Sequence, residues 1–157
     1  MAEDFTHLDD EGHVRMVDVG GKEPTDRFAV AEATVLMSEA TRDRLFSGDL
    51  PKGDALATVR LAAIQGAKRT PELVPLAHPL PIDAVTAAIE QTDDGARITV
   101  TASVTAKTGV EMEAITGAAV GAIALYDMIK GVDRGAEITN VRLLEKRGGK
   151  SGDWSRG

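Results

Sequence analysis

The sequence predicts an α+β fold in which helices cover one face of a four-stranded antiparallel sheet. Segments with the two-residue alternation of strands and segments with the helical repeat follow in the order strand, helix, strand, strand, helix, strand, if two neighbouring helices count as one crossover. The two middle strands are joined by the turn sequence TDDG, which favours an antiparallel hairpin. This is the ferredoxin-like, or split β-α-β, pattern. At 157 residues the chain has the size of one compact domain.

The amino-terminal half contains one predicted strand and two predicted helices. Residues 1–25 show neither period, and we interpret them as a flexible amino-terminal arm before a single domain over residues 26–147. Residues 28–37 alternate, with one face apolar and the other carrying Glu32 and Thr34, as in a strand with one buried face. Ser38 is expected to cap a short helix that ends at Gly48, and Asp54 to cap a second one. The apolar face of that second helix is Leu56, Val59, Ala63, Ile64 and Ala67.

The carboxyl-terminal half supplies the hairpin, a long helix and the last strand. Thr70 followed by Pro71 is typical of a capped helical turn. Strands are predicted over residues 82–91 and 96–106, a helix over 112–130 that Gly131 ends, and a strand over 137–145. Residues 148–157 form a Gly-rich tail that is not expected to continue the last strand.

Composition excludes several functional classes. A net charge of −7 argues against a general nucleic-acid binder, which needs a basic face. The absence of cysteine excludes thiolate metal sites and a cysteine nucleophile. No apolar run approaches the roughly 20 residues that cross a bilayer, and the start lacks the features of a signal peptide. We therefore expect a cytoplasmic protein with no membrane partner. Because aromatic residues are only 3%, the core must be built from small side chains, and such cores often rely on neighbouring subunits.

The long helix has two distinct faces. One is an apolar stripe that should face the core, formed by Ile115, Ala118, Ala122, Leu125 and Ile129. The other face contains Gly117 and Gly121, each of which costs about 1 kcal/mol relative to Ala, so a close neighbour is expected there. Glu113 and Asp127 also share this face but are separated by about 21 Å along the helix. Either the substrate is long, or a twofold partner brings the start of one helix towards the end of another. We favour the partner, because it would also account for the small residues.

Several charged residues allow more than one interpretation. Asp127 and Lys130 are spaced to touch, either as an ordinary surface ion pair or as an acid/base pair. Glu111 and Glu113 either complement the helix dipole or bind a substrate. His78 is held between two prolines and is either structural or functional; it could also ligate a metal with the two glutamates. GGKSGD is not a Walker loop, because Leu144 occupies a required glycine position, but its Lys150 could reach an anion.

Five long segments, in order, resemble the cyclic pyranopterin monophosphate synthase (MoaC) family of molybdenum-cofactor biosynthesis. They are MVDVGGKEPTDR (16–27), KGDALATVRLAAIQGAKRT (52–70), LVPLAHPL (73–80), TGVEMEAITGAAVGAIALYDMIKG (108–131) and VRLLEKRGGKSGDW (141–154). The resemblance implies a ferredoxin-like subunit in a homohexamer, a trimer of dimers with active sites at the dimer interface. It implies a lyase reaction in which cyclised dihydro-GTP, supplied by a radical S-adenosylmethionine enzyme, becomes cyclic pyranopterin monophosphate and pyrophosphate.

The resemblance also assigns expected roles to individual residues. Asp127, Lys130 and Lys52 would be catalytic and would handle protons during ring opening and closure. The expected substrate-binding residues are His78, Ala77, Glu111, Met112, Glu113, Arg27, Lys68 and Lys150. The cationic ones suit a triphosphate, and the two glutamates suit the N–H edge of a guanine-type base. No cofactor is expected beyond Mg²⁺ that could accompany the triphosphate. Ala77 stands where the family commonly has Cys, and we interpret it as a packing position.

Two other functional classes stay open. A noncatalytic ligand-binding module of the same fold should tolerate Asp127→Asn and Lys52→Ala without losing its function. A metal-dependent hydrolase would need His78 and the acidic pair as ligands and should lose its activity on chelation.

Overall fold

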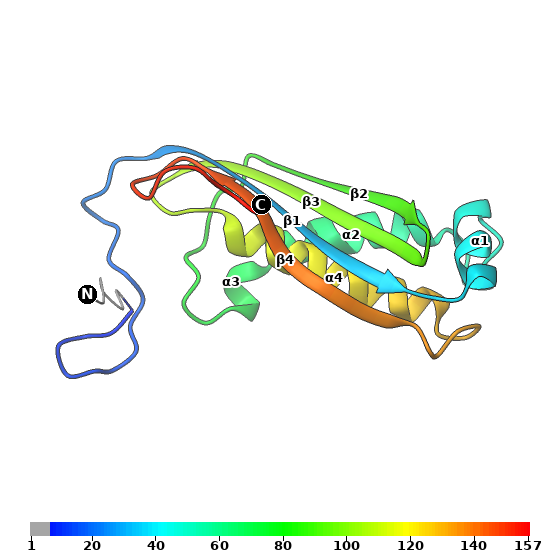
Figure 1. Ribbon diagram of the computed structural model, residues 1–157. Helices are drawn as coiled ribbons and strands as arrows, with labels where there is room; N and C mark the ends of the chain where they lie inside the picture. The colour runs from blue at the N-terminus through cyan, green and yellow to red at the C-terminus, as the bar shows by residue number, and fades with distance from the viewer. Residues whose placement is uncertain (1–6) are drawn as a thin grey trace.

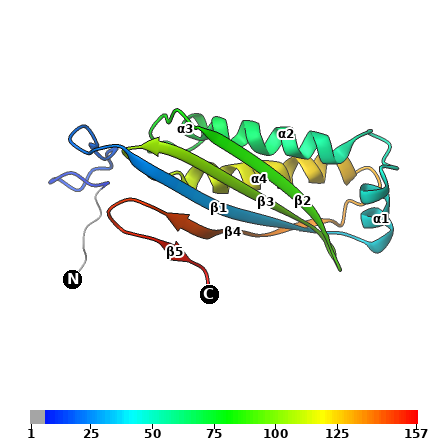
Figure 2. The ribbon, with the colours of Figure 1, turned by 90° about the horizontal axis from the view of Figure 1, so that it is seen from above.

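The protein is an antiparallel sheet with helices packed on one face, as the sequence predicts (Figures 1 and 2). The computed structural model describes residues 7–157. The strand order in the sheet is β2-β3-β1-β4-β5, so the four predicted strands have the ferredoxin-like order and a fifth is added at one edge. The strands are β1 (Thr25–Leu36), β2 (Ala84–Thr92), β3 (Gly95–Ala106), β4 (Glu137–Arg147) and β5 (Trp154–Ser155). The helices are α1 (Glu39–Ser47), α2 (Ala55–Lys68), α3 (Thr70–Leu73) and α4 (Glu111–Ile129).

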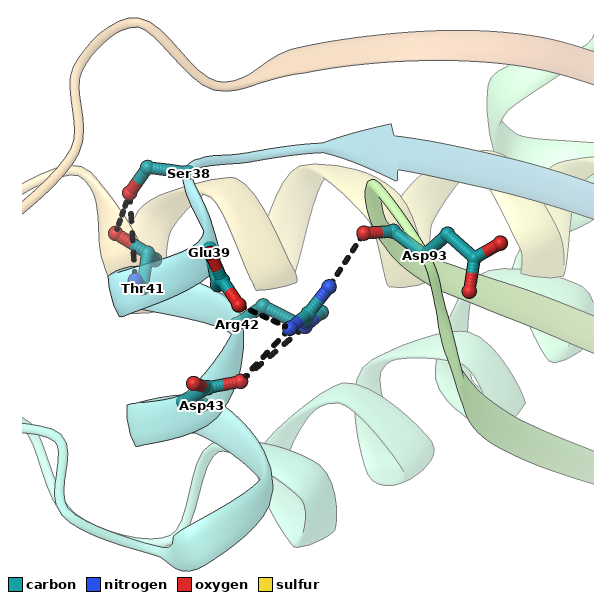
Figure 3. Close-up of polar contacts among 6 residues, drawn as sticks. All are labelled: Ser38, Glu39, Thr41, Arg42, Asp43 and Asp93. Atoms are coloured by element: carbon teal, nitrogen blue, oxygen red, sulfur yellow. Dashed lines mark hydrogen bonds and ion pairs between the residues drawn. The ribbon is translucent and has the colours of Figure 1, made fainter.

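Helix α1 begins and ends at the residues that the sequence indicates. The Ser38 side chain accepts a hydrogen bond from the Thr41 backbone N–H at 3.3 Å, which satisfies a donor that the first turn leaves free. Gly48 ends the helix in the left-handed conformation, at φ 79°. Figure 3 shows how Arg42 then ties α1 to the β2–β3 hairpin: its guanidinium donates to the Asp93 carbonyl and to the Asp43 carboxylate. The cap of α2 is confirmed as well, since Asp54 accepts from the Ala57 N–H at 3.0 Å.

One detail differs from the prediction, and one was not anticipated. Thr70 does not cap α3; it is the first helical residue, and its hydroxyl donates back to the Ala67 carbonyl at 2.9 Å, at the end of α2. The Gly-rich tail does not continue β4, as predicted, but it returns to the sheet as a separate strand, because Gly148 and Gly149 adopt φ values of 85° and 84° and close a turn. The Gly148 N–H donates to the Asp153 carboxylate at 2.9 Å within this turn. The tail therefore holds β5 rather than continuing β4.

The core lies between the sheet and helix α4. The inward residues of β1 are fully buried, and so is most of the apolar stripe of α4: Ala118, Ala122, Leu125 and Ile129. Ile115 is only partly buried. The layer is thin because its side chains are small, which brings the helices close to the sheet and to each other.

Helix α2 of the same chain is the close neighbour of Gly117 and Gly121. The expectation that a twofold partner packs against them is wrong. A Cβ atom at Gly117 would lie 2.9 Å from the Ala63 carbonyl oxygen, and one at Gly121 would lie 3.1 Å from the Ala63 Cβ. A third glycine, Gly66 on α2, faces Val120 on α4. The two helices pack closely through these positions, so the glycines do not point to an interface between subunits.

Helix α4 is more apolar than the sequence reasoning allowed. With 19 residues, it is the one helix in residues 7–157 that is long and apolar enough to cross a bilayer. Length and composition alone give weak support for a membrane span, because the central helix of a compact domain meets the same criteria. Here one side of the helix packs against α2 and the sheet (Figure 2).

Candidate active site

Helix α4 carries candidate residues at both of its ends. Glu111 is its first residue, and Asp127 lies in its last turn. Glu113 and Asp127 are 14 residues apart in the sequence, which corresponds to about 21 Å along the helix axis. The candidates therefore form two separate groups within one chain.

The first group is a trio of charged side chains at the carboxyl end of α4, formed by Lys52, Asp127 and Lys130. One oxygen of the Asp127 carboxylate lies 2.7 Å from Lys130 Nζ, and the other lies 3.0 Å from Lys52 Nζ. Lys52 Nζ also donates to the Asp127 backbone carbonyl at 2.8 Å, one of the carbonyls that the last turn of a helix leaves free. Spacing alone indicated the contact between Asp127 and Lys130, and the tertiary structure adds Lys52.

The two ammonium groups set the charge of Asp127. The hydrogen bond from Lys130, followed by the one from Lys52, lowers the pKa of the Asp127 carboxyl below its ordinary value. Asp127 is therefore ionised at neutral pH and can accept a proton, while the two ammonium groups can donate one. All three side chains are about half exposed, so a substrate can reach them.

The second group lines a groove of about 1050 Å³ at the other end of α4. Five parts of the chain meet there: the amino-terminal arm, the start of β1, the segment between α3 and β2, the segment between β3 and α4, and the turn before β5. Three residues predicted from the sequence, Arg27, His78 and Lys150, lie in this groove. The full lining is His7, Val17, Val19, Lys22, Glu23, Thr25, Arg27, His78, Lys107, Thr108, Gly109, Gly149, Lys150 and Ser151.

The groove is rich in positive charge although the chain as a whole carries a charge of −7. Its lining includes the cations Lys22, Arg27, Lys107 and Lys150 but one carboxylate, Glu23. Within residues 7–157, none of these four cations forms a salt bridge. Unpaired cations in a concave surface attract anions, so the groove suits a ligand with several negative charges.

Arg27 is held at the floor of this groove. Its Nη2 atom donates to the Lys107 backbone carbonyl at 3.4 Å, and its Nε is buried without a partner in the described part of the chain. The Gly149 backbone lies directly against the guanidinium group, where a side chain would overlap it. Gly149 therefore matters for its lack of a side chain as well as for its turn conformation, a role that the sequence did not suggest.

His78 faces the arm. Its Nε2 atom lies 2.8 Å from the Val17 backbone carbonyl. Since a carbonyl can only accept, Nε2 carries the hydrogen, and Nδ1 is the acceptor of the neutral ring. The neighbouring Ala77 is half-buried, and its N–H closes a turn by donating to the Val74 carbonyl at 3.1 Å.

The acidic residues at the start of α4 differ in environment. The Glu111 carboxylate lies over Gly109, a residue of the groove lining. Glu113 is buried, with 3% of its surface exposed, and desolvation together with the nearby Glu111 charge raises its pKa to about 7. Glu113 can therefore gain or lose a proton near neutral pH. Met112, between them, is 41% exposed on the outer surface.

Lys68 is not in the groove. It lies in a separate hollow of about 300 Å³ between α2 and the start of β2, together with Leu80 and Ile82. Within one chain, the structure brings Lys68 near neither the trio nor the groove.

Lys107 is one of the groove residues that the sequence did not indicate, together with Lys22 and Gly149. It lies between β3 and α4, immediately before the segment that carries the family resemblance. Its position at the end of a predicted strand is a place where functional side chains often occur, and that signal could have identified it.

The proposed metal ligands do not come together in one chain. Within residues 7–157, no group of three or more His, Asp or Glu side chains lies close enough to hold a metal ion. His78 and the pair Glu111 and Glu113 are thus not assembled as the metal-dependent hydrolase would require.

The sequence of residues 16–149 matches the model of the MoaC family. The chain belongs to the MoaC family. The matched range contains the trio and most of the groove, and it begins early enough to include the part of the arm that contacts His78. Lys150 lies one position beyond it.

Curated members of the MoaC family are similar over nearly the entire chain. A protein from Streptomyces avermitilis named cyclic pyranopterin monophosphate synthase is 53% identical over 97% of this chain and 89% of its own length. Proteins with the same name from Geobacter metallireducens and Novosphingobium aromaticivorans are 52% and 51% identical, over 97% and 96% of this chain and 96% of their own lengths in both cases.

Proposed function

We propose that this MoaC-family chain is a cyclic pyranopterin monophosphate synthase that converts cyclised dihydro-GTP to cyclic pyranopterin monophosphate and pyrophosphate. The observation that carries the proposal is sequence identity: about half of all residues, over nearly the full length, are identical to those of proteins that bear this name. Two features of the chain fit such a reaction: a cluster with both a proton acceptor and proton donors, and a cationic groove.

The trio at the end of α4 has the groups that ring opening and reclosure need. Asp127, ionised between two ammonium groups, would accept a proton from the substrate, and Lys52 or Lys130 would return one. Because each lysine is already hydrogen-bonded to the same carboxylate, a proton taken from the substrate at one point can be delivered at another by a short path. The trio would thus act as one proton-handling unit.

The groove would hold the triphosphate. A triphosphate carries about four negative charges at neutral pH, with a terminal pKa similar to that of a phosphate monoester. Arg27 and Lys150 offer charged donors at one surface, and such donors also stabilise a pyrophosphate as it leaves. His78 lines the same surface and would hold the arm there through its contact with the Val17 carbonyl. Mg²⁺ could accompany the phosphates. Lys68 would contribute only if another subunit brings its hollow close to the groove.

The start of α4 would recognise the base. Glu111 lies beside the groove, and a carboxylate there can accept hydrogen bonds from an amino group and a ring N–H. Glu113, with a pKa of about 7, could either accept such bonds or donate one, according to its protonation state. Met112 would supply an apolar contact, and Ala77 would serve as a packing position that needs no thiol.

The distance between the two groups favours an active site shared by two subunits. The trio and the groove lie at opposite ends of a helix of 19 residues, which is about 28 Å long, so one small substrate cannot use both in the same chain. A twofold partner would place the trio of one chain beside the groove of the other. Leu61 and Ile123, 66% and 60% exposed on the helical layer, supply apolar surface for such contacts. The proposed assembly is a homohexamer, a trimer of dimers.

The proposal also implies the class of the reaction and the enzyme that supplies the substrate. Loss of pyrophosphate with ring rearrangement makes the enzyme a lyase, and a radical S-adenosylmethionine enzyme would provide the cyclised substrate. We expect both to act in the cytoplasm.

Phosphorus NMR of the purified protein with cyclised dihydro-GTP tests the function. The expected result is a pyrophosphate signal together with a cyclic phosphate signal, in equal amounts. If folded protein forms neither product, the proposed function is wrong.

A further inference from the structure

Lys107 is placed by the pairing of β3 with the start of β1, whose residues Thr25 and Arg27 line the groove. β3 ends at Ala106, which pairs with Thr25 at the start of β1. The next residue, Lys107, accepts the Arg27 hydrogen bond on its backbone carbonyl. Its backbone is therefore fixed beside Arg27, and its side chain contributes to the groove lining.

The ammonium group of Lys107 has a single hydrogen-bond partner within residues 7–157. Nζ donates to the Gly20 backbone carbonyl of the arm at 2.8 Å. No carboxylate in the described part of the chain lies within salt-bridge distance of it. The residue is half-buried, and an approaching anion would meet no competing carboxylate at its ammonium group among the described residues.

The arm leaves most of the binding capacity of Lys107 unused. An ammonium group has three N–H donors, and the Gly20 carbonyl takes one of them. The other two are available to phosphate oxygens. His78 makes a parallel contact with the Val17 carbonyl, so two groove residues hold the arm, each through a neutral acceptor.

We propose that Lys107 is a further binding residue for the anionic part of the substrate, and that it binds a polyphosphate while still holding the arm. The inference rests on the proposed function for the identity of the substrate. Lys107 is not among the residues that the family resemblance indicates. Its charge, its position beside Arg27 and its unused donors assign it this role.

Calorimetric titration with inorganic tripolyphosphate at constant ionic strength tests the proposal on the full-length protein. Lys107→Gln keeps a donor for the Gly20 carbonyl but removes the charge, and it should weaken binding about tenfold to a hundredfold. Lys107→Arg should restore most of the affinity. Arg97→Gln, which removes one positive charge from a surface pair on β3 outside the groove, is the matched control and should bind like the unaltered protein.

Three outcomes would overturn the proposal. The first is that Lys107→Gln binds tripolyphosphate as well as the unaltered protein does. The second is that Lys107→Arg, with unchanged circular dichroism, is as weak as Lys107→Gln, because the charge would then not matter. The third is that the unaltered protein does not bind tripolyphosphate. Since the titration involves no turnover, its result is independent of whether cyclised dihydro-GTP is converted.

Discussion

The buried carboxyl of Glu113 predicts a specific dependence of stability on pH. Burial raises its pKa from the ordinary value of 4.5 to about 7. A folded state that holds a proton more tightly than the unfolded state is favoured at low pH. The contribution to stability is therefore fully present below pH 4.5, falls as the pH rises to about 7, and is absent above that.

The size of the effect follows from the two pKa values. Each tenfold change in proton affinity corresponds to about 1.36 kcal/mol, so the difference between 4.5 and about 7 corresponds to about 3 kcal/mol. Glu113→Gln keeps the shape of the side chain and removes its titration. Relative to the unaltered protein, this variant should gain up to about 3 kcal/mol of unfolding free energy between pH 4.5 and 8.

Urea unfolding at a series of pH values, with the protein concentration fixed, measures this difference. All other titrating groups cancel when the variant is compared with the unaltered protein at the same pH. Glu111→Gln is the control, since the Glu111 charge raises the pKa of Glu113 less than burial does. It should keep most of the pH dependence. If Glu113→Gln and the unaltered protein follow parallel curves from pH 4.5 to 8, the carboxyl does not titrate as burial requires and the reasoning is refuted.

Three further predictions concern the trio, the helix contact and the alanine before His78. Asp127→Asn should lower pyrophosphate release from cyclised dihydro-GTP by about a hundredfold or more, with unchanged circular dichroism. The control Arg97→Gln should keep full turnover, and comparable rates for the two variants would exclude a proton-handling role for Asp127. Gly117→Ala should lower the unfolding free energy in urea by about 1 to 3 kcal/mol through overpacking. Gly131→Ala, where a Cβ meets nothing within 4 Å, should change it little. Equal urea midpoints for the two variants would contradict the close contact between α2 and α4. Ala77→Cys should leave turnover unchanged, and a requirement for this substitution to obtain any product would show that the thiol matters.

Local features of the fold were predictable because they depend on residues close in sequence. The Ser38 and Asp54 caps, the glycine end of α1 and the β2–β3 hairpin each rest on contacts within a few positions. The contact between Asp127 and Lys130 was predictable for the same reason, since both lie on one helix. β5 was not, because its pairing with β4 depends on a glycine turn whose conformation the composition does not specify.

The groove and the third member of the trio depend on contacts between distant segments. Lys52 reaches Asp127 only after the turn before α2 folds against the end of α4. Lys107 and Arg27 become neighbours through strand register, and the arm joins them through backbone carbonyls, which carry no sequence signal. The resemblance to the MoaC family named most of these residues but could not indicate which of them share one surface.

The sequence by itself determined the α+β class, the positions of the elements and the family, because alternation, helical periodicity, caps and long matching segments can all be read along the chain. The tertiary structure decided what covers the glycines of α4. Small residues show that something packs closely, but α2 of the same chain and a second subunit would leave the same pattern in the sequence. The Ala63 contacts resolve this in favour of α2. Which element fills a given surface depends on contacts between residues far apart in sequence, and periodicity along the chain does not report them.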